Sequence, residues 1–326
     1  MIKVLVIGKY NSIVHWTENT VEAFKQSGCK VDYFALNGDT AIQSLYFKLA
    51  GKMRGSKLQI VTDSLYKKLN AFKPDLIVFV MIASNWLPES VFQMAAETCP
   101  KAKTVAWVGD KFTQEEGVFA NHVDWVFCTD TAFIDAVHEY KLSSPASYLP
   151  LAVDPAKFHP MNMTRSNAII YVANNTVGRG KMVSTIERPV TLYGKGWSKL
   201  KDSPHIINAY RLPYAKLPQT YASCRAVLNV KNEKNVINGL SQRSFEPYGC
   251  MTPVLNDDMQ DIDLCFEAGK EILVYHSMDE LHELYDRLVA DATFASSIGQ
   301  AGYKRVMAEH TYAHRAQSIL AQIGVQ

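Results

Sequence analysis

The sequence predicts an α/β protein built of two doubly wound, Rossmann-like domains that face a central cleft. Short β-branched apolar runs alternate with amphipathic stretches along the chain, which is the pattern of a parallel sheet with helices on both faces. Runs such as residues 2–8 are apolar almost throughout, as strands covered on both faces are. The alternation lapses once, in a Pro-rich polar segment at 153–167, and then restarts. A chain of 326 residues is long enough for two domains, which we place at residues 1–157 and 158–326.

Residues that start and stop helices locate the individual elements. Thr17 is a suitable helix cap, Gly28 a helix stop and Pro88 a helix start. In the first domain we expect helices at 17–28, 64–75, 88–100 and 131–140, between strands at 2–8, 29–36, 76–82, 103–110, 123–130 and 147–153. In the second domain we expect strands at 168–175, 189–197, 205–212, 226–232, 252–257 and 271–277, with helices between them.

The composition is that of an ordinary folded protein. The chain is 48% hydrophobic, and its formal net charge of +2 gives no global field that would attract nucleic acid. We therefore expect no nucleic-acid partner. The six cysteines form no C-x-x-C pair and mostly adjoin apolar residues, so we expect buried free thiols and a reducing compartment.

Two segments bear on membranes. The first ten residues read as a strand without the layout of a signal peptide, and the longest apolar run, residues 76–83, is too short to span a bilayer. We expect a cytoplasmic protein. The run from Lys48 to Lys57 carries four cations and no acid. It has two interpretations: a solvated helix end and loop, or docking to an anionic acceptor or to the inner face of the membrane.

Ligands bind at the carboxyl ends of the strands in such sheets, so polar residues there are the candidates for chemistry. In the first domain, a strand runs into a helix through residues 8–19. The segment lacks G-x-G-x-x-G, so a dinucleotide site is not favoured. His15 is either a catalytic base or a hydrogen-bonded loop residue. Asp110, at the end of another strand, is either a base or a turn residue.

In the second domain, three strand ends carry glycines or cations. Residues 172–182 combine amides, two glycines, Arg179 and Lys181, which suits a phosphate, although a flexible basic loop is the alternative. Gly194 lies in a second glycine-flanked turn, and Arg211 follows a third strand.

The stretch LSQRSFEPYGCMTPVLND, residues 240–257, gives the strongest signal. It predicts a helix beginning near Ser241, whose unpaired first-turn amides would attract a diphosphate. Arg243 could add bidentate charge. Glu246, one turn further, would accept hydrogen bonds from vicinal hydroxyls such as those of a ribose. A structural ion pair between Arg243 and Glu246 is the alternative.

Three segments of the second half of the chain carry a family resemblance. GLSQRSFEPYGCMTPVLND, then FEAGKEILVYHSMDELHEL, then AGYKRVMAEHTYAHRA together resemble the C-terminal half of GT-B-fold, group 1 glycosyltransferases, and most of all the spore-maturation CgeB-type proteins. The likeness covers most of residues 148–316, while the N-terminal half is similar in outline only.

This resemblance implies that the C-terminal domain binds a nucleotide-activated sugar and the N-terminal domain the acceptor. It implies that Glu246 holds the ribose hydroxyls and that a last helix, at about 310–323, crosses back to the N-terminal domain. Many retaining relatives carry a second glutamate at the position of Asn238, and this departure leaves the sugar and the stereochemistry open. The residues that the resemblance and the strand ends assign to the donor are Arg179, Lys181, Gly194, Arg211, Gly239, Leu240, Ser241, Gln242, Arg243 and Glu246.

The sequence thus predicts a transferase that moves a sugar from a nucleotide donor to a hydroxyl of a glycan, lipid-linked or protein acceptor in surface glycan assembly. Tyr10 and Asn11 are assigned to the acceptor side, and Asp110 or His15 to catalysis. We expect neither a cofactor nor a metal: no Asp-x-Asp lies where a metal-dependent enzyme needs it, and His310 and His314 lack a third ligand. A nucleotide-sugar epimerase and a non-catalytic glycan- or nucleotide-binding protein remain as alternatives.

Overall fold

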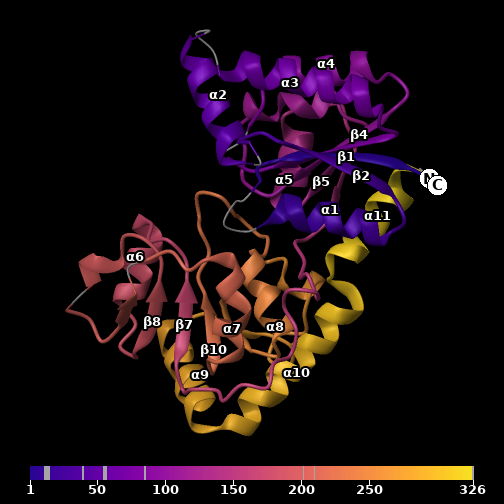
Figure 1. Ribbon diagram of the computed structural model, residues 1–326. Coiled ribbons are helices and arrows are strands. Elements are labelled where there is room, and N and C mark those ends of the chain that lie inside the picture. Colours follow the sequence, from indigo (N-terminus) through magenta and orange to yellow (C-terminus); the bar gives the residue numbers. More distant parts are fainter. Residues whose placement is uncertain are drawn as a thin grey trace. The chain divides into compact units, whose positions relative to one another are not determined.

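The chain divides into two compact units in the computed structural model (Figure 1), which describes residues 1–10, 15–38, 40–53, 57–83, 86–200, 202–208 and 210–324. The first unit comprises Met1–Leu149 and Tyr312–Gln326, and the second comprises Pro150–Thr311. The chain therefore passes from the first unit to the second between Leu149 and Pro150. The Pro-rich composition had indicated a later boundary, at 157/158. Val153, which precedes the predicted boundary, packs in the second unit: its side chain is fully buried and its N–H donates to the His310 carbonyl (2.9 Å).

The first unit contains a six-stranded parallel sheet in the order β2-β1-β3-β4-β5-β6. Its strands are β1 (Lys3–Gly8), β2 (Lys30–Ala35), β3 (Leu76–Met81), β4 (Lys103–Val108), β5 (Trp125–Cys128) and β6 (Ala146–Tyr148). Its helices are α1 (Trp16–Gln26), α2 (Ala41–Met53), α3 (Lys57–Phe72), α4 (Glu89–Thr98), α5 (Thr131–Glu139) and α11 (Tyr312–Ile323), with a 3₁₀ helix η2 (Glu116–Asn121). Figure 1 shows α3 and α4 on one face of the sheet and α1 and α11 on the other, as a doubly wound sheet requires.

The sequence analysis did not predict α2. Its apolar residues Ile42, Leu45, Tyr46 and Leu49 are exposed, whereas Phe47 is buried. A helix whose apolar residues mostly face outward gives no inward-facing stripe from which to predict it.

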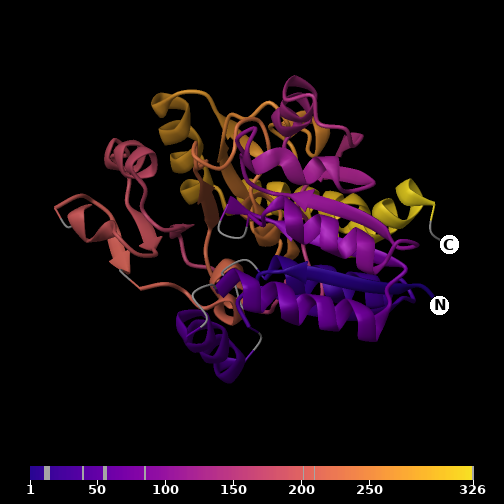
Figure 2. The same cartoon turned by 90° about the horizontal axis from the view of Figure 1, so that it is seen from above.

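The second unit contains a parallel sheet in the order β12-β11-β10-β7-β8-β9. Its strands are β7 (Ile169–Val172), β8 (Val190–Tyr193), β9 (Ile206–Asn208), β10 (Ala226–Asn229), β11 (Val254–Asp257) and β12 (Leu273–Tyr275). Its helices are α6 (Val177–Ser184), α7 (Leu217–Ala222), α8 (Glu246–Gly249), α9 (Met278–Ala290) and α10 (Ala292–Glu309), with 3₁₀ helices η3 (Trp197–Leu200), η4 (Tyr214–Lys216), η5 (Gln242–Ser244) and η6 (Ile262–Leu264). Figure 2 gives a second view of these strands and the helices beside them.

The strand order of this sheet indicates where a ligand would lie. The chain begins at β7, proceeds to β8 and β9 on one side, and then returns to place β10 on the other side of β7. Open α/β sheets bind ligands outside the carboxyl ends of the strands at such a switch point. The residues that follow β7 and β10 therefore define the candidate site.

The predicted fold class and all twelve predicted strands are confirmed, with the boundaries shifted by a few residues. The prediction of buried free thiols is also confirmed, since all six cysteines are buried and free. Among the helices that the structure describes, none is both long and apolar enough to cross a membrane.

Candidate functional site

A buried amide network joins the carboxyl ends of β10 and β11 in the second unit. Asn229 Nδ2, at the end of β10, donates to Asn256 Oδ1 (2.7 Å) and to Ser244 Oγ (3.0 Å). Asn229 Oδ1 accepts from Ser241 Oγ (3.1 Å) and from Arg243 Nε (3.0 Å). The network fixes the Arg243 guanidinium at the switch point of the sheet.

A second guanidinium lies at the same switch point. Arg179, on α6, is only 9% exposed, and its Nε donates to the Val230 carbonyl (3.3 Å). The Tyr171 hydroxyl donates to the same carbonyl (3.0 Å), and the Arg243 guanidinium carbon lies 5.8 Å from the centre of the Tyr171 ring. Burial, and next the positive charge of Arg243, lower the pKa of Arg179 to about 10. Two close cations beside one tyrosine are suited to an anion that carries more than one charge.

Glu246 is a buried carboxyl group beside these cations. It is 3% exposed, and the Tyr214 hydroxyl donates to its Oε1 (3.0 Å). Burial raises the pKa of Glu246 to about 8, although Tyr214, Arg243, Gln242 and Lys157 each act to lower it. The carboxyl group is therefore mainly protonated at neutral pH, and the structure contains no Arg243–Glu246 ion pair of the kind that the alternative interpretation required.

The predicted helix from Ser241 is wrong in form. The chain instead makes the 3₁₀ helix η5 at 242–244 and a single turn, α8, at 246–249. Pro247 lacks the N–H that a continuous helix would need to bond the carbonyl of Arg243. The dipole of so short a turn is small, so the two guanidinium groups, rather than a helix terminus, supply the positive charge.

Arg165 fixes the position of the α8 turn. Its guanidinium donates to the carbonyls of Cys250 (2.7 Å) and Met251 (3.1 Å), at the end of α8. It also donates to Thr252 Oγ1 (2.7 Å) and to the Cys224 carbonyl (3.1 Å). The sequence analysis missed this residue, because only the tertiary structure brings the linker beside these carbonyls.

The sequence analysis also missed Asp257, at the end of β11. Its Oδ2 accepts from the backbone N–H of Lys231 (2.8 Å), while its Oδ1 is buried without a hydrogen-bond partner in the described structure. Burial raises the pKa of Asp257 to about 6, against the lowering effects of Lys231 and Arg243. An acid directly after a buried strand was the signal that could have identified it.

The turns after β7 and β8 are joined to each other. Lys195 N donates to Asn174 Oδ1 (3.0 Å), and Asn175 N donates to the Lys195 carbonyl (2.9 Å). Gly194 has φ +136°, and a Cβ there would lie 2.0 Å from the carbonyl oxygen of Ala173. Gly194 is therefore required for this close approach of the two turns.

The other residues that the sequence analysis assigned to the donor differ in burial: some are buried near Glu246 and others are exposed. Gly239 and Leu240 are buried, and Gln242 bonds the Glu246 side chain. Lys181 and Arg211 are exposed, so the structure does not bring them into the cluster of Arg179 and Arg243.

The catalytic candidates lie at one edge of the first unit's sheet. Gly109, at the end of β4, leaves room for the Trp16 ring, since a Cβ there would lie 2.2 Å from it. His15 is the residue before Trp16, and Asp110 is the residue after Gly109. The contact between Trp16 and Gly109 therefore holds the backbone next to both candidates. His15 Nδ1 lies 3.7 Å from Glu18 Oε1, and Asp110 Oδ2 accepts from Ala83 N (2.8 Å).

The acceptor-side candidates are described in part. Asn37 holds Tyr10, because its Nδ2 donates to the Tyr10 carbonyl (2.7 Å) and its Oδ1 accepts from the Tyr10 N–H (2.8 Å). The Tyr10 ring stacks on Tyr33 with the ring centres 4.3 Å apart. Asn11 and the side chains of Lys48 and Lys57 lie outside the described residues.

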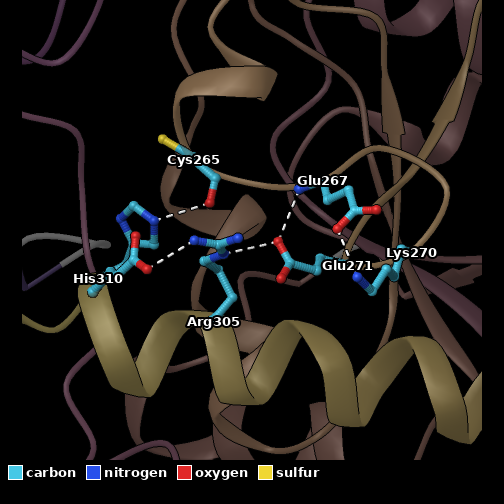
Figure 3. Close-up of polar contacts among 7 residues, drawn as sticks. Cys265, Glu267, Lys270, Glu271, Arg305 and His310 are labelled. Carbon is cyan, nitrogen blue, oxygen red and sulfur yellow. Dashed lines mark hydrogen bonds and ion pairs between the residues drawn. The ribbon is translucent and has the colours of Figure 1, made fainter.

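A separate polar cluster joins the end of α10 to the segment before β12 (Figure 3). Arg305 donates from Nε to Glu271 Oε2 and from Nη1 to Glu309 Oε1, both at 2.8 Å. His310 Nε2 lies 3.0 Å from the Cys265 carbonyl oxygen, and His310 caps α10 rather than sharing a helix with His314. No group of three His, Cys, Asp or Glu residues is placed to hold a metal in the part of the chain that the structure describes.

Residues 179–321 match the model of a family described as glycosyl transferase-like. This segment contains both guanidinium groups and both buried carboxyl groups of the cluster. No curated protein matches the chain.

Solved structures give the fold. The chain is similar to sucrose-phosphate synthase from Thermosynechococcus elongatus, with a TM-score of 0.69 and 12% identity over 99% of this chain and 98% of that one. It is similar to Anabaena HepE in complex with UDP-glucose, with a TM-score of 0.67 and 12% identity over 100% of both chains. It is also similar to a DNA-modifying β-glucosyltransferase, with a TM-score of 0.63 and 13% identity over 99% of this chain and 100% of that one. The predicted GT-B class of two Rossmann-like domains is thereby confirmed.

Proposed function

We propose that this protein is a glycosyltransferase that moves a sugar from a nucleotide-activated donor to a hydroxyl group of an acceptor. The observation that carries the proposal is the pair of guanidinium groups, Arg179 and Arg243, at the switch point of the second unit. A diphosphate with its two or more negative charges matches two fixed cations. The glycosyl transferase-like match to residues 179–321 supports the same function.

The donor would lie along this cluster. Arg243 and Arg179 would hold the diphosphate, and Glu246 would hold the ribose hydroxyls. The Glu246 side chain already bonds Tyr214 and Gln242, and an ionised carboxylate has further lone pairs that can accept from the hydroxyls. Two of the similar structures were determined with UDP-glucose. A uridine diphosphate hexose is therefore the first donor to test.

The chemistry proposed is metal-independent and uses no resident cofactor. An acceptor oxygen attacks the anomeric carbon, the bond to the diphosphate breaks, and the leaving group takes the bonding electrons as an anion. Arg179 and Arg243 stabilise that anion without a metal. If the reaction inverts the anomeric centre, Asp110 or His15 removes the acceptor proton.

The finer assignments follow the resemblance. We propose a CgeB-like subgroup, a cytoplasmic location and a glycan, lipid-linked or protein acceptor in the assembly of a surface polysaccharide or glycoconjugate. Membrane contact near Lys48 and Lys57 stays a prediction, and the exposed apolar residues of α2 are compatible with it.

The experiment is a melting-temperature screen with saturating UDP, GDP, dTDP or CMP, without added metal. A ligand at about 100 times its Kd adds roughly 2.7 kcal/mol, which raises the melting temperature by several degrees. The sugars of the stabilising nucleotide are then assayed for transfer to acceptors. Turnover without any acceptor would indicate an epimerase, and binding without hydrolysis or transfer would indicate a binding protein. No stabilisation by any nucleotide would refute the donor site.

A further inference from the structure

The two carboxyl oxygens of Asp257 differ: one accepts a backbone hydrogen bond, and the other has no hydrogen-bond partner in the described structure. Oδ2 accepts from the Lys231 N–H (2.8 Å) and so fixes the chain beyond β10. Oδ1 is buried and has no hydrogen-bond partner in the described structure. A buried acceptor left unpaired costs folding free energy. An asparagine could accept the Lys231 bond equally well without a charge, as the neighbouring Asn256 does in its own network.

A short path of contacts links Asp257 to the two guanidinium groups. The Arg243 guanidinium lies over the Tyr171 ring, and the Tyr171 hydroxyl and Arg179 Nε both donate to the Val230 carbonyl. The next residue, Lys231, donates its N–H to Asp257. The Arg243 charge also acts to lower the pKa of Asp257, so the Asp257 carboxyl group lies close to Arg243 and to the proposed diphosphate site.

The chemistry of a carboxylate limits what it can hold there. Its charge repels a phosphate, and it has no proton to donate when ionised. It accepts strongly from a hydroxyl group. A nucleotide sugar has hydroxyl groups on both sides of its diphosphate, on the ribose and on the transferred sugar, and Glu246 is already proposed to bind the ribose.

We propose that Asp257 Oδ1 accepts a hydrogen bond from a hydroxyl group of the transferred sugar, and so helps to determine which sugar the protein takes. This inference rests on the proposed donor site. It places a carboxylate on the sugar although Asn238 stands where many retaining relatives have a glutamate. In this assignment Glu246 binds the ribose, Arg243 and Arg179 bind the diphosphate, and Asp257 binds the transferred sugar.

The test compares the Kd of UDP with the Kd of UDP-glucose by calorimetry, for the wild type and for Asp257→Asn. The substitution keeps the size and an acceptor for Lys231, so the fold is retained. Relative to the wild type, we expect the ratio of the two Kd values to shift roughly 10-fold or more against UDP-glucose, since a hydrogen bond to a charged group is lost. The Kd of UDP alone should change by less than about threefold or improve, because a charge that repels phosphate is removed.

Asp258→Asn is the matched control. Asp258 is the next residue, its side chain is 62% exposed, and it pairs with His276 (3.3 Å). The Asp258→Asn substitution should leave the ratio of the Kd values of UDP and UDP-glucose unchanged. Equal changes for UDP and UDP-glucose in Asp257→Asn, or no change for either, would overturn the sugar contact while leaving the donor site intact. Failure of the wild type to bind either compound would overturn the donor site and this inference together.

Discussion

Replacing Glu246 by Gln should make the protein more stable at high pH and weaken its binding of nucleotide. The pKa of this carboxyl group is about 8 in the folded protein against an ordinary value of 4.5, because burial disfavours the charged form. The folded state therefore binds the proton more tightly than the unfolded chain does. This tighter proton binding by Glu246 stabilises the folded state. The stabilisation is fully present below about pH 4.5 and is lost as the pH rises through about 8.

The size of the effect follows from these two pKa values. Between about pH 5.5 and about pH 8.5, the wild type should lose about 3 kcal/mol of stability through Glu246 alone. In the second unit, that corresponds to a melting temperature lower by roughly 6–12 °C. A glutamine side chain does not titrate, so Glu246→Gln should lack this loss.

The assay is thermal unfolding of the wild type and Glu246→Gln at both pH values, with UDP titrations of each variant at about pH 8.5, where the carboxyl group is mainly ionised. Glu283→Gln, a substitution of an exposed glutamate on α9, is the matched control and should unfold as the wild type does. At this pH we expect the nucleotide affinity of Glu246→Gln to be roughly 10-fold or more below that of the wild type, because a charged acceptor of the ribose hydroxyls is lost. The same pH dependence in Glu246→Gln as in the wild type would show that the carboxyl group is not buried as described. Unchanged nucleotide affinity would show that Glu246 does not bind the ribose.

Three further predictions concern the diphosphate, the turns and the metal. Arg243→Ala should weaken UDP binding roughly 10- to 100-fold but leave uridine binding almost unchanged, since only the diphosphate contacts are lost; equal losses for both ligands in calorimetry would contradict this role. Gly194→Ala should lower stability by about 3 kcal/mol or more, because the Cβ would lie 2.0 Å from the Ala173 carbonyl at φ +136°. Gly269→Ala, at φ +79° with open space around it, should cost only about 1 kcal/mol in the same melting experiment. Transfer activity should survive complete chelation of divalent ions, and a rate restored only by added Mg²⁺ or Mn²⁺ would refute the metal-independent chemistry.

Much of the fold followed from local patterns. Alternating apolar runs and amphipathic stretches identified all twelve strands. The signal is clearest for central strands such as β3, because a strand covered on both faces is apolar throughout. The helix α2 escaped prediction, since its exposed apolar residues give no inward stripe. The helix expected from Ser241 became a 3₁₀ turn, since Pro247 removes an N–H that the helix needs.

The sequence by itself predicted the residue types of the candidate site, through the strand ends and the family resemblance that point to Arg179, Arg243 and Glu246. Only the tertiary structure decided which of the cations gather, because it buries Arg179 beside Arg243 but leaves Lys181 and Arg211 exposed. It also decided the protonation of Glu246, since a pKa depends on burial and neighbours that no spacing encodes. The unpaired oxygen of Asp257 arises in the same way, because whether an acceptor finds a donor is settled by the packing of distant segments around it.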